Sequence, residues 1–454
     1  MPITSLFAGF NQAVRSMQQS QFALTVHSSN VANANDPNFT RRDVLPPSEI
    51  RDHGPGVLRS RDAFIEDQFR RATGVLGDAE IRRNILSKVE DIFGDPVDGG
   101  LRKAIDQFYD AFQGLTENPG DGVARLEAIT AGENFAQHIR LAYQQVTGVE
   151  QTVNEELPVR VDEVNTQLEK IFDLNKRISE LQRHRLPDAD LRDQRDQAVD
   201  ALAKLTGART IDNEDGTIRV IVGSTVVLDG GPSIIRLKLV NGSNGPVPTW
   251  VGYPTPNYGG TGTIAGLVAV RDTELKQMKQ EIDNLGKAVA TTVNTQHRLG
   301  KGLDGVDGRD FFTITAAPAD IEVVRTLKPE QVAAGGAAGT GEQSDGRNAR
   351  LLANLGESPV LNSIIIPGQV QSPRVYYRNL VGWVGSRTKT AAQTEEVSKA
   401  HVNLSTQQRQ AYWGVSLDEE VAKMTAEQKA FQAAARIIST MDEMLDTLIN
   451  RTGR

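Results

Sequence analysis

Residues 5–40 read SLFAGFNQAVRSMQQSQFALTVHSSNVANANDPNFT and carry only two charged side chains, Arg15 and Asp36. Apolar and small residues recur along this stretch in alternating steps of four and three, which predicts a helix with a heptad seam. The seam consists of Leu6, Phe10, Ala13, Met17, Ser20, Leu24, His27 and Val31. The rest of the helix is rich in Gln, Ser and Asn, whereas a solvated coiled coil carries Glu and Lys beside its seam.

Two interpretations fit this weakly charged helix. It is either an amphipathic helix of the chain's own core, or a helix whose several faces are covered by other copies of the protein. Amides and hydroxyls can be buried when they are hydrogen-bonded, whereas buried charges cost much more. We therefore favour the second interpretation and predict that this helix takes part in polymerisation.

The C-terminal end has a similar pattern. Ser416 and Glu419 form a capping box, Ser-x-x-Glu, which predicts the start of a long helix. The predicted seam of this helix includes Leu417, Val421, Met424, Phe431, Ala435, Ile438 and Leu445. Chain termini usually lie near one another at a domain surface, so we expect the two terminal helices to pair.

Helices, a β-rich stretch and further helices follow one another between the two ends. Helical patterns cover 62–93, 101–112, 123–181, 190–205, 267–297, 348–355 and 374–412, with a kink or restart expected at Pro158. Strand patterns cover 217–222, 225–228, 234–240, 311–314 and 321–324. We expect a hairpin turn at Gly223-Ser224, and we expect Asn241-Gly242 to close the strand over 234–240.

The predicted fold class is mainly α with a β-rich insert, α+β, built as an elongated helical bundle. We expect a terminal coiled-coil polymerisation domain from 1–40 and 414–454. A helical bundle domain would comprise 41–205 and 346–413. A β-rich outer domain would comprise 206–345, from which helix 267–297 could pack back on the bundle.

Composition excludes several classes of protein. Fifty basic and 58 acidic residues give a net charge of −8, which argues against nucleic-acid binding. The chain of 454 residues has no run of 18 apolar residues and no cysteine, so we expect neither a membrane span nor a thiolate metal site. Its first residues lack the basic and apolar regions of a Sec signal.

The sequence contains no recognisable catalytic or metal-binding motif. Its six histidines lie at no common metal-ligand spacing. Asp304, Asp307 and Asp310 recur every third residue, but the intervening glycines indicate tight turns and not a calcium loop. We therefore predict a protein that is not an enzyme, with no catalytic residues, no cofactor and no metal site.

Residues 29–41, SNVANANDPNFTR, closely resemble the signature that ends the first helix of bacterial flagellar rod, hook and hook-associated proteins. That signature reads Ser-Asn-Asn-Ile-Ala-Asn-x-x-Thr-Pro-Gly-Tyr. Asp36 replaces its usual Thr and Asn38 its usual Gly, and both changes are mild because Asp can cap a turn and Asn tolerates positive φ. The resemblance places Asn30 and Asn33 in the predicted polymerisation interface.

Further segments resemble the hook-associated protein 1 family, the first hook–filament junction protein. They occur in the family's order from residue 29 to residue 448. The residues that carry this family signature are Asp193, Arg195 and Asp196 in DLRDQRD, Arg271 in the Gly-Gly to Arg-Asp stretch, Asn294 in VNTQH, and Asp418 and Glu419 in GVSLDEE.

The resemblance implies a structural subunit that is exported through the flagellar type III apparatus without a Sec signal. It implies an extracellular location at the hook–filament junction, with the terminal helices in an inner tube and the β-rich part outside. The implied partners are further copies of the chain, the hook protein, the second junction protein and a cytoplasmic export chaperone. Neither nucleic acid nor membrane is expected as a partner.

Three alternatives stay open at this point. Another flagellar axial protein, such as the hook subunit or the second junction protein, would share the first signature but not the DQRD and VNTQH segments. A secreted enzyme on an axial scaffold would need a catalytic constellation in residues 206–345, where none is evident. A cytosolic coiled-coil scaffold would carry Glu and Lys beside its seam, which residues 5–40 do not.

Overall fold

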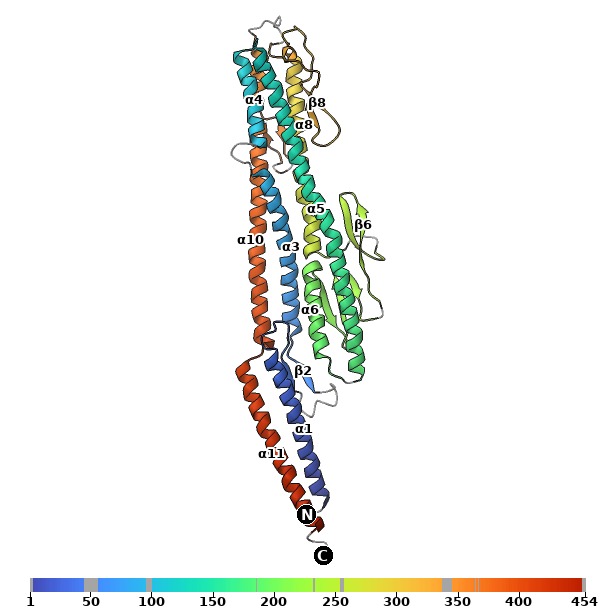
Figure 1. Cartoon of the computed structure of the whole chain (residues 1–454). Coiled ribbons are helices and arrows are strands. Elements are labelled where there is room, and N and C mark those ends of the chain that lie inside the picture. The colour runs from blue at the N-terminus through green and yellow to red at the C-terminus, as the bar shows by residue number, and fades with distance from the viewer. Residues whose placement is uncertain are drawn as a thin grey trace.

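The protein is a long rod of helices with a β-rich lobe on one side and a separate helix pair at one end (Figure 1). The computed structural model describes residues 3–44, 56–94, 100–184, 186–231, 233–253, 257–336, 345–363, 365 and 367–450. Both chain ends lie at the far tip of the helix pair, as the sequence led us to expect (Figure 1).

The rod is built from helices, the longest of which run nearly parallel to its axis (Figure 1). They are α1 (Ile3–Ala32), α3 (Ala63–Phe93), α4 (Leu101–Glu117), α5 (Gly122–Arg183), α6 (Ala189–Thr206), α7 (Thr263–Ala269), α8 (Lys276–Leu299), α9 (Arg347–Asn354), α10 (Pro373–Trp413) and α11 (Leu417–Asn450). A π-helical turn, η1 (Val270–Leu275), joins α7 to α8, and η2 (Pro329–Gln331) is a short 3-10 turn.

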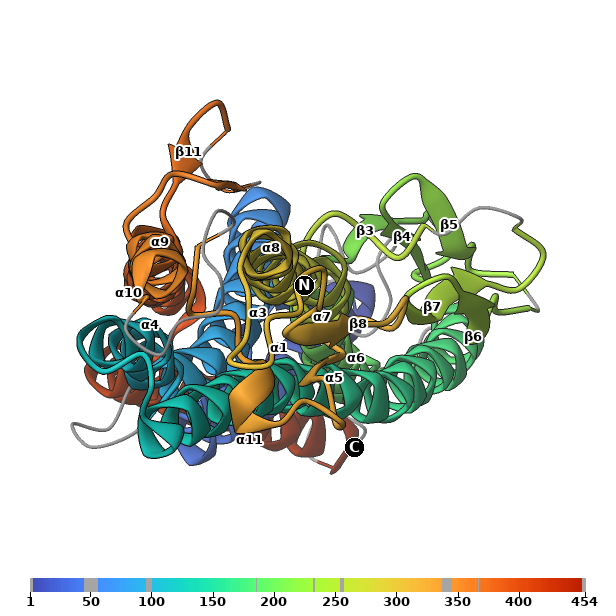
Figure 2. The same cartoon turned by 90° about the horizontal axis from the view of Figure 1, so that it is seen from above.

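The strands form small antiparallel sheets. They are β1 (Arg42–Val44) with β2 (Val57–Arg59), β3 (Arg209–Asp212) with β4 (Ile218–Val222) and β5 (Thr225–Leu228), β6 (Leu237–Gly242) with β7 (Gly245–Trp250), β8 (Phe312–Ile314) with β9 (Ile321–Val323), and β10 (Leu361–Asn362) with β11 (Val370–Gln371). Strands β3 to β7 form the lobe, which lies to one side of the helices when the rod is viewed from above (Figure 2). The predicted fold class, mainly α with a β-rich insert, is confirmed.

The expected restart at Pro158 is wrong, because α5 is one helix of 62 residues with Pro158 inside it. Proline removes one backbone hydrogen bond and crowds the preceding turn. Here Leu157 and Val161 on either side of it are buried in the two hydrophobic clusters of the body. Burial of this apolar face on both sides of the proline offsets the loss of the backbone hydrogen bond.

The turn predicted at Asn241-Gly242 is also misplaced. Both residues belong to β6, and Gly242 pairs with Gly245, so the hairpin turns at residues 243–244. The partner strand β7 was not predicted because it contains Pro246 and Pro248, which usually argue against a strand. A two-stranded ribbon has only edge strands, where a proline can be tolerated.

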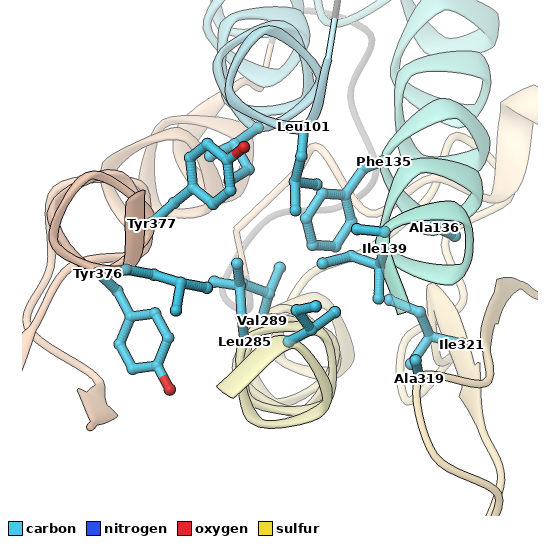
Figure 3. Packing of buried hydrophobic residues seen from close by; sticks show 14 of the residues in the cluster. Leu101, Phe135, Ala136, Ile139, Leu285, Val289, Ala319, Ile321, Tyr376 and Tyr377 are labelled. Atoms are coloured by element: carbon cyan, nitrogen blue, oxygen red, sulfur yellow. The ribbon is translucent and has the colours of Figure 1, made fainter. Parts of the chain in front are cut away.

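The main hydrophobic core lies in the half of the rod away from the helix pair. Figure 3 shows Leu101 from α4, Phe135 and Ile139 from α5, and Leu285 and Val289 from α8 converging there. A second cluster joins α5 and α6 to the sheet of the β-rich lobe. Since α8 contributes to the main core, it packs with the bundle helices; the division into three domains itself remains a prediction.

The VNTQH segment anchors the chain that follows α8. Asn294 donates from Nδ2 to Phe312 O and accepts at Oδ1 from the backbone N–H groups of Phe311 and Phe312. His297 Nδ1 lies 2.8 Å from Arg309 O, and its Nε2 accepts from Ala333 N at 2.9 Å. The second bond requires a bare Nε2, so the buried imidazole is neutral with its hydrogen on Nδ1.

This arrangement predicts a pH-dependent loss of stability. Burial lowers the pKa of His297 to about 4 from its ordinary value of 6.5. The unfolded chain therefore takes up a proton between pH 6.5 and 4 that the folded chain does not, so stability is complete above pH 6.5 and falls as the pH drops towards 4. We expect His297 to account for a loss of about 3 kcal/mol across that window.

Urea unfolding of the wild type and His297→Gln at pH 7.0 and pH 4.5 checks this expectation. The variant should be less stable at pH 7.0 and should lose less stability on acidification than the wild type. The control is His138→Gln, because His138 is only half-buried and its described side-chain contact is with Asn134 O in its own helix. If His297→Gln lost as much stability as the wild type between pH 7.0 and pH 4.5, the assignment of this pH dependence to His297 would be contradicted.

Candidate functional site: the terminal helix pair and its joint

Helices α1 and α11 pack against each other in antiparallel orientation below the body of the rod (Figure 1). His27 in α1 contacts Glu420 near the start of α11. Near the tip, a Cβ atom at Gly9 would lie 2.6 Å from Met441 Cε. These two pairs of neighbouring residues define which residues of α1 lie opposite which residues of α11.

The seam that the structure forms is shifted from the predicted one. On α1 it consists of Gly9, Ala13, Ser16, Ser20, Ala23, His27 and Asn30, and on α11 of Glu420, Met424, Glu427, Phe431, Ala434, Ile438, Met441 and Leu445, all buried or half-buried. Both series follow strict heptad steps. The α1 side of the seam is small or polar throughout, so apolar side chains come mainly from α11.

The predicted interface residues fall into three groups in this pair. Phe10, Met17, Leu24, Val31, Met424, Phe431, Ala435, Ile438 and Leu445 are half-buried, and Asn30 is fully buried. Leu417 and Val421 are 49% and 54% exposed, so their predicted place on the seam is wrong. The side chain of Leu6 lies outside the described residues.

Glu420 is the residue that displaces Leu417 and Val421 from the seam. Its side chain is fully buried, and Oε2 lies 2.7 Å from His27 Nδ1 and 2.9 Å from Asn30 Nδ2. Lys423 Nζ lies 3.7 Å from its other oxygen. His27 and Asn30 replace the water that Oε2 loses, whereas Oε1 has no hydrogen-bond partner within the described contacts and gains only the nearby charge of Lys423. Hydrophobic periodicity gives no signal for such a residue.

Asn30 also ties the helix pair to the rest of the chain. Its Nδ2 donates to Arg42 O at 2.8 Å, and its Oδ1 accepts from Arg42 N at 3.1 Å. The side-chain amide thus pairs with the backbone of β1 as a strand residue would. Asn33, the other asparagine of the predicted interface, donates to Ser29 O within its own helix end.

A network of arginines and carboxylates forms the joint between the helix pair and the body. Two carboxylates of α6, Asp193 and Asp196, accept from Arg59 Nη2 at 2.6 and 2.7 Å. Arg42 Nη2 lies 3.2 Å from Asp193, and Arg61 Nη2 lies 3.2 Å from Asp196. The DQRD segment therefore holds the strands that follow α1 against the body.

The network continues between the helices of the body. Arg70 of α3 donates from Nε to Asp200 at 2.8 Å and lies 3.3 Å from both Glu66 and Asp196. Arg409, near the end of α10, lies 3.0 Å from Glu66 and 2.8 Å from Asp200. The guanidinium of Arg409 also stacks between Phe69 and Trp413, at 3.8 and 4.8 Å from the ring centroids.

Two buried carboxylates of this network, Asp196 and Glu66, have pKa values shifted in opposite directions. Burial alone would raise the pKa of Asp196, but Arg61, Arg59, Arg70 and Arg195 around it hold that pKa well below its usual range. Burial raises the pKa of Glu66 above its usual value despite the guanidiniums of Arg70 and Arg409. Asp196 is thus an ionised carboxylate surrounded by the arginines of the joint.

The remaining signature residues join separate segments of the chain. Arg195, fully buried, donates to Asn175 Oδ1 and to Gly216 O. Arg271, in the π-helical turn η1, donates to Asn154 Oδ1 at 3.0 Å and to Pro246 O at 2.6 Å, which ties the β6–β7 hairpin to α5. Each of these contacts is structural.

Asp418 and Glu419 lie at the start of α11. Glu419 N donates to Ser416 Oγ at 3.4 Å, as the predicted cap requires, and the Glu419 carboxylate lies 2.8 Å from Lys423 Nζ. Asp418 is exposed. Acidic residues in a first turn interact favourably with the helix dipole.

The outward surfaces of the pair have little charge on α1 and a second apolar stripe on α11. The exposed side chains of α1 include Asn11, Gln12, Gln18, Gln21, Thr25 and Ser28, with Arg15 as the one charged group among those described. The exposed stripe of α11 consists of Ala426, Ala430, Ala433, Ile437, Thr440 and Met444, again in heptad steps. The α11 helix therefore has one stripe against α1 and another facing solvent.

Two of the three aspartates that recur every third residue after α8 are held in ion pairs. Asp304 and Asp310 pair with Arg309 and Arg298 respectively. Within the described part of the chain, no three His, Asp or Glu side chains gather closely enough to hold a metal ion. In the same residues, no helix is both long and apolar enough to cross a membrane.

Comparison with known proteins identifies relatives along the whole chain. A family model described as the flagellar hook-associated protein FlgK helical domain matches residues 86–312. A second, described as the flagellar basal body rod FlgEFG protein C-terminal, matches residues 406–451. The chain is 27% identical to the flagellar hook-associated protein 1 of Bacillus subtilis, covering 99% of both chains.

Two further comparisons agree with these. The chain is 24% identical to the flagellar hook-associated protein 1 of Salmonella typhimurium, covering 97% of this chain and 99% of that protein. The solved structure of the flagellar hook junction protein FlgK from Burkholderia pseudomallei matches 77% of this chain and 100% of that chain, with a TM-score of 0.65 and 16% identity. At that identity the structural likeness concerns the fold.

Proposed function

Since the chain belongs to the family of flagellar hook-associated protein 1, whose members are structural subunits of the hook–filament junction, we propose that it assembles through the outward faces of α1 and α11. The resemblance identified in the sequence is thereby confirmed. The interface itself is our proposal, and the structure of a single subunit supports it in two ways.

The exposed heptad stripe of α11 carries the proposal. One heptad stripe is enough to pair a helix with one partner, and α11 already uses the stripe from Glu420 to Leu445 against α1. A second stripe, with Ile437 and Met444 about half exposed, leaves apolar surface in water that a further helix could cover. Its alanines allow the backbone of that helix to approach closely.

The chemistry of α1 provides the second support. Its exposed amides and hydroxyls can exchange water for hydrogen bonds to a neighbouring subunit, whereas lysine and glutamate would have to be desolvated at a much higher cost. A helix designed only to face solvent has no need to avoid charge along eight turns. We therefore assign the predicted interface residues on α1 and α11 to contacts within and between subunits.

The same arrangement suggests where other partners bind. The hook protein and the second junction protein would contact the two ends of a ring of such subunits, with the β-rich lobe on the outside. We propose export by the flagellar type III route, with a chaperone that covers the apolar stripes of α11 before assembly. An amphipathic helix bound in a groove is a common mode of recognition.

The test is Ile437→Asp, compared with Gln432→Asp as a control that adds the same charge to the same helix. Ile437 is exposed in the single subunit, so the purified variant should keep the wild-type circular dichroism and thermal unfolding. In an assembled interface its carboxylate would be buried without a partner in every subunit, at several kcal/mol each. Gln432 is exposed and lies on the side of α11 away from both stripes, so adding a carboxylate there should be mild.

The readout is the fraction of flagella that carry a filament beyond the hook, together with the amount of the protein in the culture medium. Ile437→Asp should be exported at the normal level but should leave hooks without filaments. Normal filaments on Ile437→Asp cells would refute the assignment of this stripe. Absence of the variant from the medium would place its defect in export.

A further inference from the structure

We propose that Glu420, His27 and Asn30, which we call the register lock, set the axial register of α1 against α11. The proposal concerns the single subunit and does not depend on assembly. The rest of the seam does little to favour one register of the two helices over another. The α1 side consists of Gly9, Ala13, Ser16, Ser20 and Ala23, all small residues without a distinctive shape.

A shift by one heptad would leave most of this seam chemically similar. Ile438 would take the place of Phe431, and Met441 would take the place of Ala434, so apolar groups would still meet small ones. Heptad repeats permit such shifts, and a single buried polar group is a well-attested device that prevents them. The described seam has a group of this kind at its upper end.

The register lock connects three elements at one carboxylate and one amide. Glu420 Oε2 accepts from Asn30 Nδ2 at 2.9 Å and lies 2.7 Å from His27 Nδ1, and all three side chains are buried. Asn30 at the same time makes two further bonds to the backbone of Arg42 in β1, donating to its O and accepting from its N–H. Sliding α1 away from the body breaks every one of these contacts.

The connections of the two helices show which of them could slide. Only residues 414–416 join α10 to α11, so α11 is held axially by the body. Nine residues, 33–41, separate α1 from β1, and nine residues can extend to roughly 30 Å. A one-heptad shift requires only about 10 Å. Asn30 therefore holds the end that the chain itself leaves free.

The direction of the shift follows from the next heptad. Glu427, half-buried, lies seven residues after Glu420 on the same face of α11. If α1 moved one heptad towards the tip, His27 and Asn30 would meet Glu427. Glu420 would then lose its hydrogen bonds to His27 and Asn30. The native register is therefore more stable than the shifted one while Glu420 is present. Replacing Glu420 by leucine removes that penalty.

Disulfide trapping in the full chain tests the register lock, since the protein has no native cysteine. The native register places Ala13 opposite Ala434, both of which are buried, whereas the shifted register places Ala13 opposite Met441. The native reporter is Ala13→Cys with Ala434→Cys, and the reporter of the shift is Ala13→Cys with Met441→Cys. Each is oxidised at low protein concentration and scored as an intramolecular cross-link.

In the wild-type background we expect only the native reporter to cross-link. Glu420→Leu should raise the ratio of shifted to native cross-link by at least about tenfold, which corresponds to about 1.4 kcal/mol. Asn30→Ala should shift the ratio in the same direction. Glu427→Leu is the matched control, because it removes the same side chain from the same face one heptad away and should leave the native register unchanged.

Four results would contradict the proposal. Glu420→Leu could keep the native cross-link alone, which would show that the seam sets its own register. It could lose both cross-links, which would make the three residues a source of pairing strength and not of register. Glu427→Leu could shift as much as Glu420→Leu, which would make the effect general to the seam. A shift in Glu420→Leu without one in Asn30→Ala would remove Asn30 from the lock.

Discussion

Replacing Asp196 with alanine is expected to lower the free energy of unfolding of the body by about 3–5 kcal/mol, the usual cost of removing one partner from a buried ion pair. Asp196 contacts Arg59, Arg61 and Arg70, and its side chain is almost fully buried. Without it, three guanidiniums remain close together with fewer carboxylates between them. Their mutual repulsion in a site of low dielectric makes the loss large.

The sign of the pH dependence is set by the same contacts. The surrounding guanidiniums hold the pKa of Asp196 below its ordinary value of 3.8, so the folded state favours the carboxylate. Its contribution to stability is therefore complete above pH 4 and is lost as the pH falls through the lower, folded-state pKa. At neutral pH the difference between wild type and Asp196→Ala should be at its full value.

Urea unfolding followed by circular dichroism at pH 7 measures the effect, with Asp190→Ala as the matched control. Asp190 belongs to the same helix and also pairs with a network arginine, Arg42, but its side chain is 79% exposed. Exposed pairs contribute about 0–1 kcal/mol, so this control should change stability little. Equal losses in the two variants would show that burial is not what makes the joint stable.

Phe431→Asp is expected to separate α11 from α1 and to abolish filaments. Phe431 is the one aromatic residue on the described α11 seam and is half-buried against the small residues of α1. Losing about half of a fully buried phenylalanine costs about 2 kcal/mol. The new carboxylate must also be desolvated or must leave the seam. Isolated helices of this length are marginal in water, so little stability is available to oppose the separation.

Limited proteolysis of the purified subunit measures the separation. Cleavage within residues 3–40 and 417–450 should be faster in Phe431→Asp, while the body should unfold at the wild-type urea concentration. The control is Gln432→Asp, which adds the same charge at the adjacent, exposed position. Wild-type cleavage rates in Phe431→Asp would show that this residue does not hold the pair together.

The sequence by itself determined the kind of fold and the chemistry of its ends. Heptad steps predicted both terminal helices, because such periodicity reflects burial along one face of a helix wherever its partner lies. A capping box also predicted where α11 begins. The weakly charged surface of α1 was also evident, since composition does not depend on tertiary structure. The signature segments identified the family, because their residue types occur together in a fixed order.

Which series of α11 residues faces α1 was decided only by the tertiary structure. Heptad patterns in α11 are compatible with more than one stripe, and hydrophobicity favoured the series that begins with Leu417 and Val421. In the structure Glu420 lies on the seam instead, because His27 and Asn30 of α1 provide its hydrogen bonds. A buried carboxylate of this kind depends on partners almost 400 residues away in the sequence, which no local pattern can reveal.

The roles of the signature residues depended on tertiary structure for the same reason. Asp193 and Asp196 could be recognised as family residues, but their partners come from β1, β2, α3 and the loop between them. Pro158 and the prolines of β7 suggested breaks that the fold does not make. Packing on both sides of Pro158 outweighs its local backbone preference, and the ribbon of β6 and β7 has only edge strands, where proline is tolerated. Local sequence sets which elements form, whereas the pairing of buried charges between distant elements decides how they are joined.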